Sequence, residues 1–72
     1  MTTYVTFGQD HVHSISGVTF DKDCVAEIPS ISPSQGRERA FEIFGRKFCF
    51  EYFNEPPDMQ FFPRGIIKVP GS

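Results

Sequence analysis

The first half of the chain alternates between apolar or β-branched residues and polar ones over short runs, a pattern typical of β-strands. Gly8 ends the first run, and Ser16-Gly17 supplies a turn between the second and the third. Pro29 ends the fourth run. We therefore expect four strands, of which the second and third form a hairpin, at residues 3–7, 11–15, 18–20 and 24–28.

Residues 33–44 have the clearest helical pattern of the chain. Ser32 supplies an N-cap hydroxyl before a proline, Gln35 completes a capping box, and Gly45 suits the C-terminal end. We expect this helix to lie on a sheet, with the Arg37 side chain reaching from its apolar face to solvent. That face consists of Gly36, Ala40, Phe41, Ile43 and Phe44.

Aromatic residues dominate the last third of the chain. Residues 48–53 read as a strand, and alternation would place Phe48, Phe50 and Tyr52 on one face of it. A loop with two prolines, a type I turn and a last strand should follow, at residues 54–58, 62–65 and 66–69.

This order of elements is β-β-β-α-β-β, with residues 24–28 as a further strand before the helix. It predicts an α+β fold. We expect a small antiparallel sheet of about five strands with one helix packed on one face. The 72 residues suffice for a single domain, residues 1–72, and are too few for a TIM barrel, a dinucleotide-binding fold or a multi-step enzyme. Because so small a domain gains stability from a second chain, we also expect a homodimer through the strand at residues 66–69.

Charge and the termini narrow the class of protein. A net charge of −2 argues against binding nucleic acid through overall positive charge. Residues 32–50 are the exception, because this segment contains four basic residues and only two acidic ones. The N-terminus lacks the pattern of a signal peptide, and no apolar run approaches the ~20 residues of a membrane span. We therefore expect a cytoplasmic location and no membrane partner.

Candidate catalytic chemistry rests on two histidines and two cysteines. His11 and His13 would share one face of a strand and could bind zinc together with Cys24 and Cys49, but the dense ligand spacing of structural zinc sites is missing. Cys49 could act as a nucleophile with a histidine as base, yet the phenylalanines on either side of it indicate burial. We predict no metal, cofactor or catalysis. A metal- or Cys-dependent small enzyme is the third alternative, and whether the two cysteines are bonded is left open.

A protein-binding surface is our first hypothesis. Large apolar side chains crowd around residues 54–58, more than a small domain buries easily, although they could instead close the core. Interfaces are enriched in aromatic residues, Met and Arg. The predicted partner-binding residues are Arg37, Phe53, Met59, Phe61, Phe62 and Arg64.

A single-stranded nucleic-acid binding module is the alternative. The segment from Arg46 to Phe53 has the ring spacing of the RNP1 strand of RNA-recognition domains, whose rings stack on successive bases. It departs from that pattern where larger or charged residues replace small and apolar ones, and only one helix is predicted. The residues involved would be Arg46, Lys47, Phe48, Phe50 and Tyr52.

Several strings of the sequence resemble short uncharacterised proteins encoded in tailed-phage and prophage genomes. The resemblance extends over nearly the whole chain, and the strings that carry it are residues 4–8, 11–13, 20–23, 36–45 and 62–65. The resemblance carries no mechanistic motif. It implies an accessory protein of the host bacterial cytoplasm that binds a host or phage protein, by analogy alone.

Overall fold

The structure, a computed structural model, describes residues 1–71 and contains the predicted helix and strands together with a short 3-10 helix. None of the helices within these residues is long and apolar enough to cross a bilayer. In chain order the elements are β1 (Thr2–Thr6), β2 (His13–Ile15), β3 (Val18–Phe20), β4 (Cys24–Pro29), α1 (Pro33–Phe44), β5 (Phe50–Phe53), η1 (Met59–Phe61) and β6 (Gly65–Lys68).

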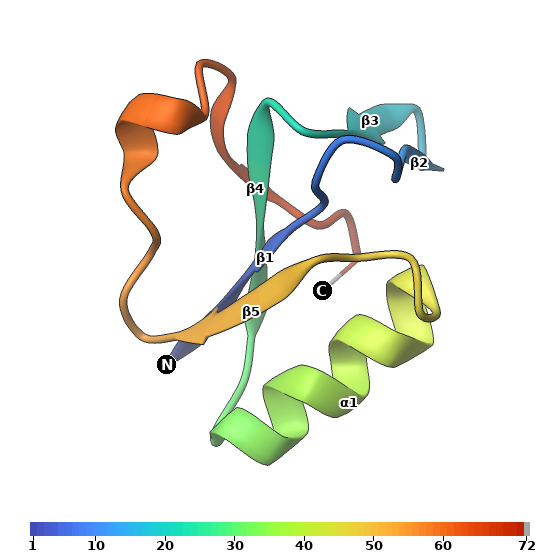
Figure 1. The fold of residues 1–72 in the computed structure, drawn as a ribbon. Coiled ribbons are helices and arrows are strands. Elements are labelled where there is room, and N and C mark those ends of the chain that lie inside the picture. Colours follow the sequence, from blue (N-terminus) through green and yellow to red (C-terminus); the bar gives the residue numbers. More distant parts are fainter. Residues whose placement is uncertain (72) are drawn as a thin grey trace.

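The α+β fold class is confirmed, and the strand arrangement differs from the expected single antiparallel sheet. Four strands form one sheet in the order β5-β1-β4-β6, and β2 and β3 form a separate hairpin. Strand β1 is antiparallel to β4 and β5, but β6 is parallel to β4. The segment between β5 and β6 connects opposite edges of the sheet and enters β6 from the end where β4 begins (Figure 1). A wholly antiparallel sheet was therefore the wrong prediction.

Local signals define α1 as predicted. The Ser32 hydroxyl accepts a hydrogen bond from the Gln35 amide at 3.1 Å, and the Gln35 side chain accepts one from the Ile31 amide at 2.7 Å. The first bond satisfies an amide that the first turn leaves unpaired, and the second holds the residue before the N-cap. At the other end Gly45 has a φ of 65° and donates to the Phe41 carbonyl. The helix thus begins and ends where the sequence indicates.

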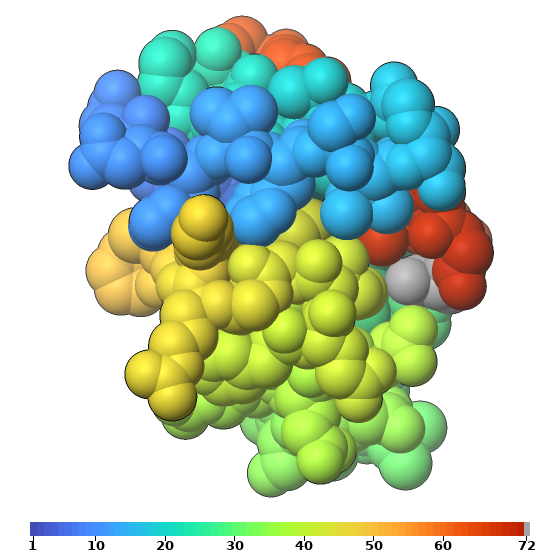
Figure 2. Space-filling model, turned by 90° about the vertical axis from the view of Figure 1, so that its right-hand side faces the viewer, coloured from blue at the N-terminus to red at the C-terminus, as the bar shows by residue number. Residues whose placement is uncertain are grey.

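The core lies between α1, one face of the four-stranded sheet and the hairpin. Phe44 is its central ring, with the centroids of Phe7, Phe20 and His13 at 4.9, 5.7 and 4.9 Å. The His13 ring also donates to the Lys47 carbonyl at 2.6 Å, so the hairpin is fixed against the C-terminal end of α1. Figure 2 shows the hairpin residues, in blue, as a band across this end of the yellow-green helix.

The turn of the hairpin has the geometry that its sequence predicts. Ser16 and Gly17 have φ values of 49° and 82°, as a type I′ turn requires. Both strands are three residues long, and β2 begins at His13 rather than at His11 as expected.

The connection from β5 to β6 lies on the side of the sheet away from α1 (Figure 1). At its start the Asn54 amide donates to the Thr2 carbonyl at 2.7 Å. At its end Arg64 holds the loop to the hairpin region, because its guanidinium donates to the Thr19 carbonyl at 2.8 Å and lies 3.2 Å from the Asp21 carboxylate.

Candidate binding groove between helix α1 and strand β5

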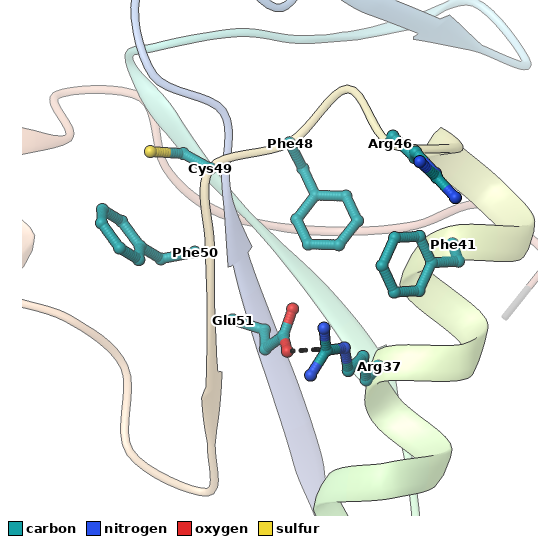
Figure 3. Close-up of a pocket in the computed structure, with 7 residues that line it drawn as sticks. All are labelled: Arg37, Phe41, Arg46, Phe48, Cys49, Phe50 and Glu51. Atoms are coloured by element: carbon teal, nitrogen blue, oxygen red, sulfur yellow. Dashed lines mark ion pairs between the residues drawn. The ribbon is translucent and has the colours of Figure 1, made fainter.

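An open groove of about 740 Å³ runs between α1 and the chain that leads into and begins β5 (Figure 3). The helix contributes side chains from two successive turns, and the chain after the helix contributes the opposite wall. The groove is lined by Arg37, Phe41, Arg46, Phe48, Cys49, Phe50 and Glu51, and these residues are called the α1–β5 groove below.

Stacked side chains form the helix wall of the groove. Arg37 and Phe41 are one helical turn apart, and the Arg37 guanidinium lies 5.6 Å from the centre of the Phe41 ring. Phe48 meets the Phe41 ring edge-on, with ring centroids 5.2 Å apart. Phe41 keeps 38% of its surface exposed although it belongs to the apolar face of the helix. The exposed part of this ring faces the groove.

An ion pair lies where the α1–β5 groove meets a second hollow. The Arg37 Nε atom lies 3.6 Å from a Glu51 carboxylate oxygen, and both side chains retain contact with solvent. The predicted exposure of the Arg37 guanidinium is therefore correct, but the sequence did not indicate its partner. Beyond this pair the second hollow, of about 240 Å³, continues along the helix toward its N-terminus. It shares Arg37 and Glu51 with the groove and is also lined by Thr3, Pro33, Ser34, Tyr52 and Phe53.

Phe48 and Phe50 point to opposite sides of the chain, which corrects the prediction of one aromatic face (Figure 3). The Cys49 amide donates to the Thr6 carbonyl at 2.7 Å, yet Phe50 is the residue paired with Thr6. Cys49 and Phe50 thus both lie opposite Thr6, which makes a β-bulge. A bulge shifts the alternation of side chains by one residue. Phe48 therefore packs toward α1. Phe50 and Tyr52 share the other face, with centroids 6.5 Å apart.

Arg46 and Cys49 also line the groove. Both are exposed, and within residues 1–71 no ion pair to Arg46 is found. Phe50 is 61% exposed. The groove therefore presents a cationic side chain and partly exposed aromatic rings within one concave surface.

The predicted partner-binding residues fall in two places. Arg37 and Phe53 line the groove and the second hollow on the helix side of the sheet. Met59, Phe61 and Phe62 lie on the connection that follows β5, where Phe61 is 69% exposed. Arg64 is engaged by the Thr19 carbonyl and the Asp21 carboxylate, so its guanidinium is already partnered.

The predicted nucleic-acid residues are also divided. Arg46, Phe48 and Phe50 line the groove, whereas Tyr52 lines the second hollow and Lys47 lines neither. Lys47 is exposed, and its carbonyl accepts the hydrogen bond from His13.

The residues considered as metal ligands or as a nucleophile do not come together in one site. Within the described chain no three His, Cys, Asp or Glu side chains are close enough to hold a metal ion. Both cysteines are free thiols, Cys24 buried and Cys49 exposed. Burial raises the pKa of the Cys24 thiol, because the thiolate would lose its hydration. The expected burial of Cys49 was wrong, since only Phe48 among its neighbours turns toward the helix.

Two groove residues, Phe41 and Glu51, were not among the predicted site residues. The spacing of Arg37 and Phe41, one helical turn apart, was the signal that could have indicated a joint surface. Glu51 had no such signal, because only the pairing of β5 with β1 brings it beside the helix.

No protein-family model, curated protein or solved structure matches the chain.

Proposed function

We propose that the protein is a non-enzymatic binding domain that captures a partner protein in the α1–β5 groove. The observation that carries this proposal is a concave surface lined by three aromatic residues and two arginines. Aromatic residues and arginine dominate the energetics of protein interfaces, because they bury large rigid areas and make directional polar contacts. The resemblance to phage-encoded proteins makes a cytoplasmic host or phage protein the expected partner.

Two further features support binding rather than catalysis. The titratable groups of the groove are the Arg37–Glu51 ion pair, Arg46 and the Cys49 thiol, and no histidine lines it to serve as a base. His13, the nearest candidate in the sequence, is held by the Lys47 carbonyl and packed between Phe7 and Phe44. A nucleophilic cysteine needs an adjacent base or a stabilised thiolate.

Single-stranded nucleic acid is the second candidate ligand, because Arg46, Phe48 and Phe50 lie together in the groove. The diverging directions of Phe48 and Phe50 make it the weaker candidate, since stacking on successive bases uses rings on one surface. Binding of this kind would fall steeply as salt is raised.

The test is affinity capture from lysogenic or infected bacterial lysate with and without nuclease, at low and moderate salt. Arg46→Ala and Phe50→Ala each remove an exposed groove side chain. Phe61→Ala, on the connection after β5, is the matched control for an exposed ring outside the groove. We expect a protein that survives nuclease treatment to be retained by the wild type and by Phe61→Ala, and lost from the two groove variants.

Retention by the groove variants together with loss from Phe61→Ala would move the binding site to the connection after β5. Recovery of nucleic acid alone, released by salt, would replace the proposal with the second candidate. Circular dichroism of each variant is the control that its fold is intact.

A further inference from the structure

Strand β5 forms one edge of the sheet, because the strand order ends with it. Its pairing with β1 sets which main-chain groups point outward. Thr3 pairs with Phe53, so Thr2 lies opposite Asn54, and the Asn54 amide donates to the Thr2 carbonyl in this register. In an antiparallel ladder such hydrogen-bonded pairs alternate along the strand. The main-chain groups of Tyr52 therefore point to β1, and those of Glu51 and Phe53 point away from the sheet.

The same two residues direct their side chains toward α1. Glu51 pairs with Val5, which belongs to the core beneath the helix, and neighbouring residues of a strand alternate between faces. Glu51 borders both hollows and Phe53 borders the second. An extra strand laid along this edge would thus run beside the α1–β5 groove, with alternate side chains directed into it.

The length of the surface suits a short extended segment. The twelve residues of α1 span about 18 Å at ~1.5 Å per residue. An extended chain advances ~3.3 Å per residue, so about five or six residues would cover the groove and the second hollow.

The charges along this surface favour an acidic segment. Arg37 and Arg46 line the groove together with one carboxylate, Glu51, which already faces Arg37 at 3.6 Å. Lys47 is exposed in the adjoining connection. A carboxylate of the added segment opposite Arg46 would complete a pair that the chain itself leaves open within residues 1–71.

From this juxtaposition we propose that an extended, acidic segment of a partner protein binds as a fifth strand on the free edge of β5. Main-chain hydrogen bonds to Glu51 and Phe53 supply affinity, and side chains that enter the α1–β5 groove supply specificity. This inference rests on the proposed function and specifies how the partner is held.

The experiment uses the full chain and peptides selected on it from a random peptide library. We expect the selected peptides to alternate apolar residues with Asp or Glu, and Arg46→Ala to weaken their binding about tenfold. In amide hydrogen exchange, the Tyr52 amide should be protected in the free protein. The Glu51 and Phe53 amides should become protected only when a peptide is bound.

A matched pair of variants isolates the main-chain contact. Phe53→Pro removes an outward-facing N–H and leaves the pairing with β1, whereas Phe53→Ala removes the same ring and keeps the N–H. Binding should weaken in both variants, because each loses the Phe53 ring, and it should fall much further in the proline variant, which also lacks the N–H. Amide spectra of both confirm that the sheet is formed.

Peptides that bind the groove equally well in Phe53→Pro, without new protection of Glu51 and Phe53, would overturn strand addition and leave the proposed function standing. If none of Arg46→Ala, Phe50→Ala and Phe53→Pro weakens binding of a captured protein, both the strand addition and the proposed function are contradicted. The absence of any enriched peptide would also overturn the inference. If protection of Glu51 and Phe53 rises with protein concentration alone, the occupant of the edge is a second copy of this chain. If an oligothymidylate produces that protection, the occupant is nucleic acid.

Discussion

Gly36 of α1 lies directly against Thr3 of β1, so that a Cβ atom added to Gly36 would overlap the Thr3 side chain. Thr3 cannot easily move, because its hydroxyl is buried in a 2.7 Å hydrogen bond with the Ser30 hydroxyl. This contact sets the distance between helix and sheet, and thereby the position of Arg37 one residue later at the groove.

Replacing Gly36 should therefore destabilise the fold although alanine favours helices. Helix propensity alone would stabilise Gly36→Ala by about 1 kcal/mol, whereas forcing an extra methyl group into a packed interface costs about 1–3 kcal/mol. We expect a net loss in the free energy of unfolding, measured by urea denaturation. Ser34→Ala, an exposed change in the first turn of α1, is the control and should leave stability nearly unchanged. A stabilised Gly36→Ala would show that the helix is free to shift away from β1.

The central ring of the core and an exposed ring should differ sharply in their contribution to stability. Phe44 is 3% exposed and packs on three other rings, so Phe44→Ala should reduce the free energy of unfolding by about 3–5 kcal/mol. Phe61→Ala removes a ring that is 69% exposed and should change it by less than about 0.5 kcal/mol. Equal losses in the two variants, measured by thermal or urea denaturation, would contradict this description of the core.

Stability should decline in acid partly through Asp21. The Asp23 amide that hydrogen-bonds to the Asp21 carboxylate, assisted by Arg64, lowers the pKa of Asp21 below its ordinary value of 3.8. A lowered pKa in the folded state contributes stability above the unfolded pKa, and this contribution is lost as the pH falls through the folded pKa. Below about pH 4 the wild type should therefore lose more stability than Asp21→Asn.

Urea denaturation between neutral pH and about pH 2 measures this difference. Asp10→Asn is the charge-matched control, because Asp10 is exposed in the loop after β1. Parallel pH profiles for the wild type and Asp21→Asn would contradict the role assigned to the Asp21 carboxylate.

The two thiols should differ in reactivity. Cys49 is exposed, whereas Cys24 is fully buried and burial raises the pKa of its thiol. A thiol reagent at mildly alkaline pH should modify one site in the folded protein and both after unfolding, as counted by mass spectrometry. Cys49→Ser should abolish the fast reaction and Cys24→Ser should preserve it. Rapid modification of Cys24 in the native state would show that β4 opens readily.

The sequence by itself determined the features that depend on neighbours within a few residues. Ser32, Gln35 and Gly45 define the ends of α1, since caps satisfy backbone groups one turn away. Ser16 and Gly17 define the hairpin, because their backbone conformation suits a two-residue turn. The periodic pattern likewise indicated the strands and the α+β class.

Only the tertiary structure decided the features that depend on distant pairing. A bulge at Cys49, formed against Thr6, separates Phe48 from Phe50, and no local pattern records it. The parallel pairing of β6 with β4 follows from which end of the sheet the preceding connection reaches. The α1–β5 groove joins residues of the helix to residues of a strand, with Arg37 opposite Glu51. Such contacts depend on strand register and on the close approach of Gly36 to Thr3, which are properties of the assembled sheet and helix.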